Sequence, residues 1–135
     1  MEESLKDRIT IKDNFNIEAD LRKQSQHYYE VGEKIVDARN ERDELSERLK
    51  IVKAELDVEI RGTATAKLTE ASIAAKIITD KRYTDVLQKF LAKEKEVGYL
   101  DVALKALEHK RGALETIAKM QMSGIIQAKS SIGGV

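Results

Sequence analysis

Residues 67–83 read KLTEASIAAKIITDKRY, and this is the one stretch where the chain stops behaving as a repeating helix. Before it lies an acidic amphipathic segment with a seven-residue period. After it lies a more basic segment with the same period. We therefore interpret the stretch as a connector between two long helices.

The connector is predicted to contain a short helix of its own. Thr69 is a suitable N-cap, and Leu68 and Ile73 occupy the two positions of a hydrophobic staple around it. We expect the short helix to end near Ile78 and Asp80 to cap the helix that follows. The connector is thus an ordered element between two hinges.

The first long segment repeats its apolar residues every seven positions. The two repeating positions hold Leu21, Tyr28, Ile35, Arg42, Leu49 and Leu56, and Gln24, Val31, Ala38, Leu45, Val52 and Glu59. Nine of these twelve residues are apolar, which fits the 3-4 spacing of a helical seam and not the alternation of a strand. Gly32 inside the pattern indicates a bend or a close helix contact.

The second long segment has the same organisation. Its two positions hold Val86, Lys93, Leu100, Leu107, Leu114 and Gln121, and Phe90, Val97, Leu104, Arg111, Ala118 and Ile125. Nine of the twelve are again apolar. Two such helices joined by a connector most simply form an antiparallel hairpin.

The predicted fold is therefore all-α, a single domain over residues 1–135. Its parts are a charged N-terminal lead at 1–13, in which 8–13 could be extended, a long helix at 16–61 preceded by possible caps at Asn14 and Asn16, a connector with a short helix at 62–80, a long helix at 81–123, and an assembly segment and tail at 124–135. Apolar residues outside the seams widen each stripe, which predicts a homo-oligomer. They are Ile51, Val58, Ile60, Leu87, Leu91, Val102, Ile117 and Met120.

Composition agrees with long helices and excludes several kinds of chemistry. The chain has no Pro, the strongest helix breaker, and no Cys, so it has no disulfide or thiolate site. No segment has the apolar length of a membrane span or a signal peptide, so we expect a protein of the cytoplasm, the host cytoplasm if a phage encodes it. Net charge is zero, but residues 1–60 carry −5 and residues 61–135 carry +5.

Candidate catalytic residues are few. His27 and His109 are the only histidines, and no acidic or cysteine partner spacing supports a triad or a metal site around either one. A phosphate-binding glycine loop is also absent. We predict no enzyme activity, no metal and no cofactor.

Basic residues gather around the connector, where small residues permit close backbone approach. This patch suits a phosphate backbone, and the aromatic ring beside it could stack on a base. The alternative is that these are ordinary solvated lysines and arginines. The candidate nucleic-acid contacts are Lys50, Lys53, Arg61, Lys67, Lys76, Lys81, Arg82 and Tyr83.

Three short motifs carry a resemblance to a known family. They are KAELD at 53–57, KIITDK at 76–81 and GALETI at 112–117, in the order helix, polar loop, Ser/Thr-Glu segment and long helix. In this order the chain, from about Leu21 to Ile125, resembles the phage UvsY-type recombination mediators.

The resemblance implies a non-enzymatic homo-oligomeric ring of six to seven helical subunits. Such a ring binds single-stranded DNA, helps displace the single-strand DNA-binding protein and loads a RecA-like recombinase. A Lys-Ala-Arg-Leu motif of the family contributes to DNA contact. The matching residues here are Lys53, Ala54, Glu55 and Leu56, so an acidic residue replaces the arginine.

The family's C-terminal helix is tied to assembly, which suits the apolar C-terminal region of this chain. The expected assembly residues are Leu100, Leu104, Leu107, Leu114, Ile117, Ala118, Ile125 and Ile126. The alternative function is a structural coiled-coil scaffold or chaperone module that binds another protein's helix.

Overall fold

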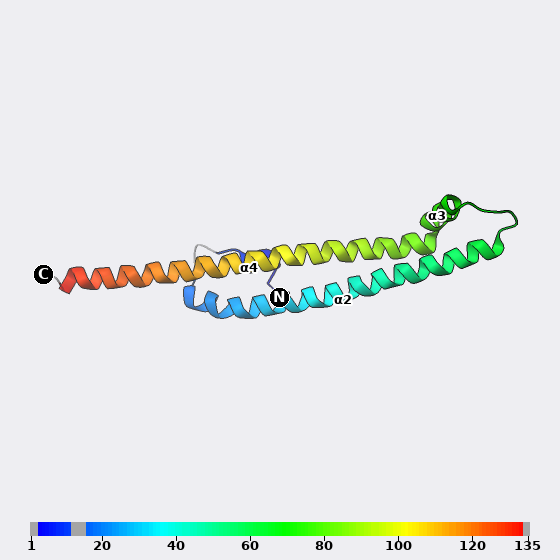
Figure 1. The fold of residues 1–135 in the computed structure, drawn as a ribbon. Coiled ribbons are helices and arrows are strands. Elements are labelled where there is room, and N and C mark those ends of the chain that lie inside the picture. Colours follow the sequence, from blue (N-terminus) through cyan, green and yellow to red (C-terminus); the bar gives the residue numbers. More distant parts are fainter. Residues whose placement is uncertain (1–2, 12–15, 134–135) are drawn as a thin grey trace. The chain divides into compact units, whose positions relative to one another are not determined.

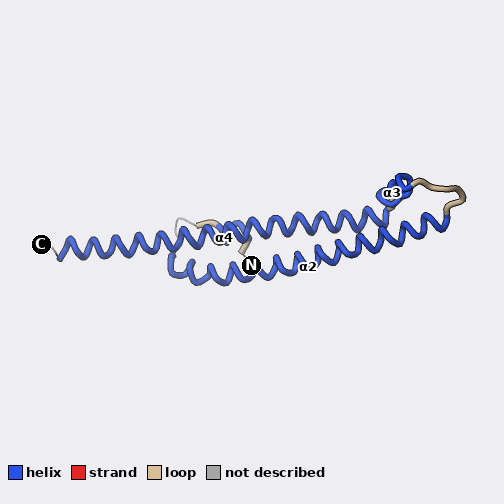
Figure 2. Tube along the Cα trace, in the orientation of Figure 1, coloured by secondary structure: helices blue, strands red, loops and turns tan. Residues whose placement is uncertain are grey.

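The structure is a computed structural model that describes residues 3–11 and 16–133, and only the backbone of residues 125–133. The described chain is helical apart from short loops and contains no strand (Figure 2). The predicted all-α class, with a long helix pair that packs together, is confirmed. The chain divides into two compact units, Met1–Lys34 with Leu100–Val135 (unit 1) and Ile35–Tyr99 (unit 2).

Four helices follow one another along the chain. They are α1 (Leu5–Ile9), α2 (Ile17–Thr63), α3 (Glu70–Thr79) and α4 (Lys81–Gly133). Side-chain caps define their starts. Asn16 Oδ1 accepts from the backbone N–H of Ala19 over 3.2 Å and so satisfies one free donor of α2. Asn14, the other candidate cap, lies outside the described residues.

Unit 2 contains the last part of α2, all of α3 and the start of α4. Its segments of α2 and α4 run side by side in opposite directions, and α3 lies against them near the start of α4 (Figure 1). The buried apolar residues come from all three helices: Ile35, Ala38, Val52 and Leu56 from α2, Ile73 and Ile77 from α3, and Val97 from α4.

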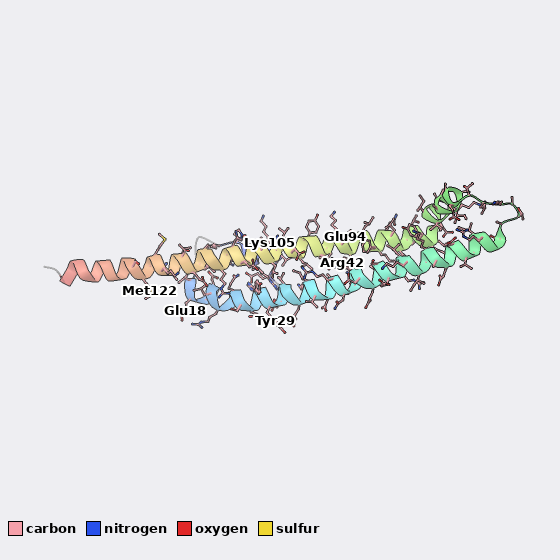
Figure 3. The ribbon with its side chains drawn as sticks, viewed as in Figure 1. Glu18, Tyr29, Arg42, Glu94, Lys105 and Met122 are labelled. Atoms are coloured by element: carbon pink, nitrogen blue, oxygen red, sulfur yellow. The ribbon has the colours of Figure 1, made fainter. Side chains whose placement is uncertain are left out.

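Two polar seam residues of unit 2 form ion pairs. Lys93 of α4 pairs with Glu41 of α2 and with Glu96 of its own helix. The hydrogen bond that Lys93 donates to Glu41, followed by the one it donates to Glu96, raises the pKa of Lys93 to about 12. Arg42, which lies on the side of α2 toward α4 (Figure 3), pairs with its neighbour Asp43 over 3.1 Å and not with a carboxylate across the interface.

Unit 1 contains the start of α2, the later part of α4 and α1. Here too the segments of α2 and α4 are antiparallel (Figure 1). The buried apolar residues are Val31 of α2 and Leu100, Ala103, Leu107 and Leu114 of α4.

The N-terminal lead differs from its prediction, because residues 5–9 are helical. Ser4 caps α1 by accepting from the Asp7 backbone N–H over 3.2 Å, and its hydroxyl donates to the Asp7 carboxylate over 2.9 Å. Arg8, expected in an extended piece, is a helical residue that is only 7% exposed. Of the extended piece at 8–13, residues 12 and 13 lie outside the described part of the chain.

Most seam residues of unit 1 are buried as the heptad pattern predicts, namely Gln24, Val31, Leu100, Leu107 and Leu114, but at two positions a neighbouring residue is buried instead. His27 is buried where Tyr28 was expected, and Lys110 is buried where Arg111 was expected. A straight α-helix drifts by about 20° per heptad from a strict 3.5-residue repeat. α1 also brings Arg8 onto this side, where it contacts α2 and α4, so residues beside the seam become covered.

The second long helix continues past its predicted end. The pattern predicted a stop near residue 123, but α4 extends to Gly133. Gly124 lowers helix propensity by about 1 kcal/mol relative to Ala, which is not enough to end a helix when no Pro follows. Gly32 likewise marks no close contact, because a Cβ added there meets nothing within 4 Å.

Candidate nucleic-acid interface

The connector is held by side-chain caps at both ends of α3. Thr69 Oγ1 accepts from the Ser72 backbone N–H over 3.1 Å, so α3 begins where its sequence predicts. Asp80 ends α3, and its carboxylate accepts from the Arg82 backbone N–H over 2.8 Å at the start of α4. Asp80 is therefore the single residue between α3 and α4, and no longer loop separates the two helices.

An apolar cluster fixes α3 against both long helices of unit 2. Its buried members are Val52, Leu56, Ile73 and Ile77, and Leu56 is only 1% exposed. Tyr83 packs against this cluster and is half-buried. The Tyr83 ring, which was expected to stack on a base, therefore packs in part against the core.

Arg61 joins α2 to the start of α3. Its guanidinium donates to Asp57 over 2.6 Å and to both carboxylate oxygens of Glu70 over 2.9 and 2.8 Å. Hydrogen bonds to Asp57 and then Glu70 raise its pKa. Arg61 is a predicted nucleic-acid contact, but in this structure its donors are occupied by carboxylates.

Arg82 joins α4 to α2 in a similar way. It donates to Glu59 through Nη1 over 2.8 Å, and to Asp80 through Nε and Nη2, both over 3.1 Å. These hydrogen bonds lower the pKa of Asp80 and raise that of Arg82, with the Asp80 contribution first. The two connector arginines, Arg61 and Arg82, therefore form ion pairs within the fold.

Four of the predicted lysines remain available. Within the described part of the chain, no ion pair or hydrogen bond is formed by the ammonium groups of Lys53 of α2, Lys67 of the loop, Lys76 of α3 or Lys81 of α4, and all four residues are exposed. Lys50 differs, because it pairs with Glu47 over 3.0 Å. Of the predicted nucleic-acid contacts, these four lysines are therefore free, whereas the two arginines are paired with carboxylates.

A groove opens between α2 and the start of α4 in unit 2. It has a volume of about 220 Å³ and is lined by Arg48, Val52, Glu55, Leu56, Arg82, Asp85 and Val86. Glu55, which comes two residues after the predicted contact Lys53, is one of its charged lining residues. The sequence pattern did not reveal this groove, because it requires residues 48–56 and 82–86 to meet in space.

The predicted assembly residues fall into two groups. Leu100, Leu107 and Leu114 are buried within the chain's own fold, so they are not exposed to a second copy. Leu104, Ile117 and Ala118 are half-buried. The side chains of Ile125 and Ile126 lie outside the described residues.

Among the described residues, α2 does not run alongside the last part of α4 in unit 1. Figure 3 shows Met122 on α4 beyond the start of α2 near Glu18. Met120 and Met122 are 67% and 64% exposed. This end of α4 therefore presents apolar surface to solvent, as do several residues predicted to lie outside the seams: Ile51, Val58, Leu91 and Val102.

Unit 1 also contains a polar core that the sequence pattern did not predict. Arg8, Gln24, His27 and Lys110 are all at most 9% exposed. Arg8 Nη1 lies 2.8 Å from Glu30 Oε2, as an ion pair without hydrogen-bond alignment, and Lys110 Nζ donates to the Arg8 carbonyl over 2.7 Å. These contacts hold α1 against both long helices.

His27 is the residue of this polar core whose pKa is shifted. Its Nε2 lies 3.3 Å from Glu3 Oε2, and its Nδ1 is buried without a hydrogen-bond partner. Burial lowers the pKa of His27 more than the nearby Glu3 raises it. The imidazole therefore favours its neutral form in the folded chain.

No catalytic or metal-binding arrangement stands out in the described residues. Among them, no group of three His, Cys, Asp or Glu side chains could hold a metal ion. A search of the same residues for a helix of sufficient length and apolar character to cross a membrane found none.

Comparisons with known proteins add no assignment. No protein-family model matches the chain, and neither a curated protein nor a solved structure matches it.

Proposed function

We propose that this protein binds single-stranded DNA and acts as a recombination mediator that helps load a RecA-like recombinase onto strands covered by single-strand DNA-binding protein. The observation that carries the proposal is the set of four exposed, unpaired lysines on three helices and a loop around one ordered connector. The resemblance to UvsY-type mediators supplies the biological role.

The charge balance of the connector limits each subunit to a weak contact. Arg61 and Arg82 are neutralised by carboxylates, so the lysines are the groups left to replace counterions on phosphates. A few such contacts give low affinity for one protomer. Repetition around a homo-oligomer of six to seven subunits would add them into useful avidity.

The direct experiment is a salt titration of binding to a labelled single-stranded oligonucleotide, with the solution mass measured on the same sample. Affinity should fall steeply between about 50 and about 200 mM salt, in proportion to the number of phosphates neutralised. The mass should correspond to a closed oligomer. Absence of binding at low salt would reject the proposal.

A second candidate is a structural scaffold or chaperone that binds another protein's helix. The exposed Met120 and Met122, on the part of α4 that the described residues of α2 do not run alongside, favour it, because Met side chains adapt to varied apolar partners. It predicts a dimer or monomer in solution and no affinity for DNA. The mass and the titration together separate the two candidates.

A further inference from the structure

The groove between α2 and α4 in unit 2 combines an apolar floor with a charged rim. Val52 and Leu56 are 6% and 1% exposed, and Val86 is half-buried beside them. Val52 and Leu56 close the bottom of the groove, and Val86 keeps the accessible apolar surface against which a flat ring can lie.

Three charged groups on the rim are free to meet a ligand. Arg48, Glu55 and Asp85 are exposed, and none of them forms an ion pair or hydrogen bond with another described residue. Arg82, the fourth charged residue, is occupied by Glu59 and Asp80. The free groups thus offer two sets of acceptor oxygens and one planar cation.

The position of the groove relates it to the free lysines. Lys53 directly follows Val52 in the chain, and Lys81 directly precedes Arg82. Because consecutive residues of a helix point about 100° apart, these lysines stand beside the groove and not in it, where they would meet the phosphates that flank a bound base. Tyr83, the aromatic residue nearest in sequence, is partly used by the apolar cluster, so a base would need another surface.

We propose that this groove receives one unstacked nucleobase of a bound single strand and favours a base with an exocyclic amino group. The amino N–H groups would donate to Glu55 or Asp85, and the Arg48 guanidinium would lie against the ring or the adjacent phosphate. Thymine, which presents a carbonyl oxygen in place of the amino group, would face carboxylates of like polarity. The inference rests on the proposed function.

Cytosine and thymine oligonucleotides of equal length test it, because their rings are similar in size and their phosphates are identical. At neutral pH and low salt, fluorescence anisotropy should give the parent protein a lower Kd for oligo(dC) than for oligo(dT), by roughly tenfold. Equal values with clear binding would overturn the base site and leave the proposed function standing. If the protein bound neither oligonucleotide, both the base site and the proposed function would be overturned.

Matched variants then locate the selectivity. Glu55→Gln and Asp85→Asn should bring the ratio of the two Kd values toward one, because an amide can also donate to thymine. Glu94→Gln, at an exposed glutamate outside the groove, removes the same charge and should leave the ratio unchanged. If Glu55→Gln and Asp85→Asn behaved as Glu94→Gln does, the groove would not be the base site.

Discussion

Arg82 of α4 holds both carboxylate oxygens of Glu59 of α2, with Nη1 2.8 Å from Oε2 and Nη2 3.3 Å from Oε1. The same guanidinium also binds Asp80, which caps the start of α4. The first turn of α4 is therefore fixed to α2 by one forked side chain. Arg82, which the sequence predicts as a DNA contact, therefore holds together two of the helices that carry the free lysines.

This tie predicts a measurable coupling between the two residues. Arg82→Gln and Glu59→Gln should each destabilise the chain slightly, and a double-mutant cycle in urea should give a small favourable coupling, since both groups are about half exposed and solvent screens the pair. Glu59→Gln should also strengthen DNA binding by releasing part of Arg82. Additive stability effects in the cycle would show that the pair does not hold α4.

The apolar cluster predicts a much larger effect for one side chain. Leu56→Ala should lower the free energy of unfolding by about 2–5 kcal/mol, because it leaves a cavity where Leu56 is 1% exposed. Val58→Ala, at a 74% exposed position one half-turn away, should change it by less than about 0.5 kcal/mol. Similar losses in both variants, measured by urea unfolding, would contradict the assigned core.

Gly32 offers a stabilising substitution. Because a Cβ there meets nothing within 4 Å and the backbone is helical, Gly32→Ala should raise the free energy of unfolding by about 0.5–1 kcal/mol. A thermal melt followed by circular dichroism should show a higher midpoint. A lower midpoint would mean that the position is filled by another chain or a ligand.

The sequence predicted the helices and the connector well, because both depend on local chemistry. The capping Thr69, the Asp80 junction and the seven-residue repeat are each readable from neighbouring residues. The partners of Arg61 and Arg82 were not readable, since Glu70 and Glu59 belong to other helices. The burial of Arg8, His27 and Lys110 in unit 1 also escaped the pattern.

His27 shows why the buried polar residues beside the seam of unit 1 could not be predicted. The residue lies beside the heptad seam and is covered only because α1 and its Arg8 contact α2 and α4. A five-residue helix with a charged buried side chain carries no apolar periodicity. The groove escaped prediction for a similar reason, because its lining comes from two separate segments.

The lowered pKa of His27 predicts a pH effect on stability. Near and below the ordinary pKa of about 6.5 the unfolded chain binds a proton that the folded chain resists, so the free energy of unfolding should fall as pH drops from about 7 to about 5. His27→Gln removes this contribution. Its urea midpoint should change less with pH over that window than the parent's midpoint does, and parallel curves would contradict the assignment.

DNA binding by the free lysines is the central claim, and a charge-matched comparison tests it most directly. One variant carries glutamate at the four connector lysines, Lys53, Lys67, Lys76 and Lys81. The other carries glutamate at four exposed, unpaired lysines of unit 1, Lys23, Lys34, Lys105 and Lys119. Circular dichroism and solution mass serve as controls that both variants fold and assemble as the parent does.

The measurement is the Kd of each variant for the same single-stranded oligonucleotide as salt rises from about 50 to about 200 mM. The connector variant should lose binding and most of the salt dependence, because its phosphate contacts are gone, while the unit 1 variant should keep the parent's slope with a weaker Kd. Equal loss in the two variants, or retained binding in the connector variant, would contradict the assignment of the DNA surface to the connector.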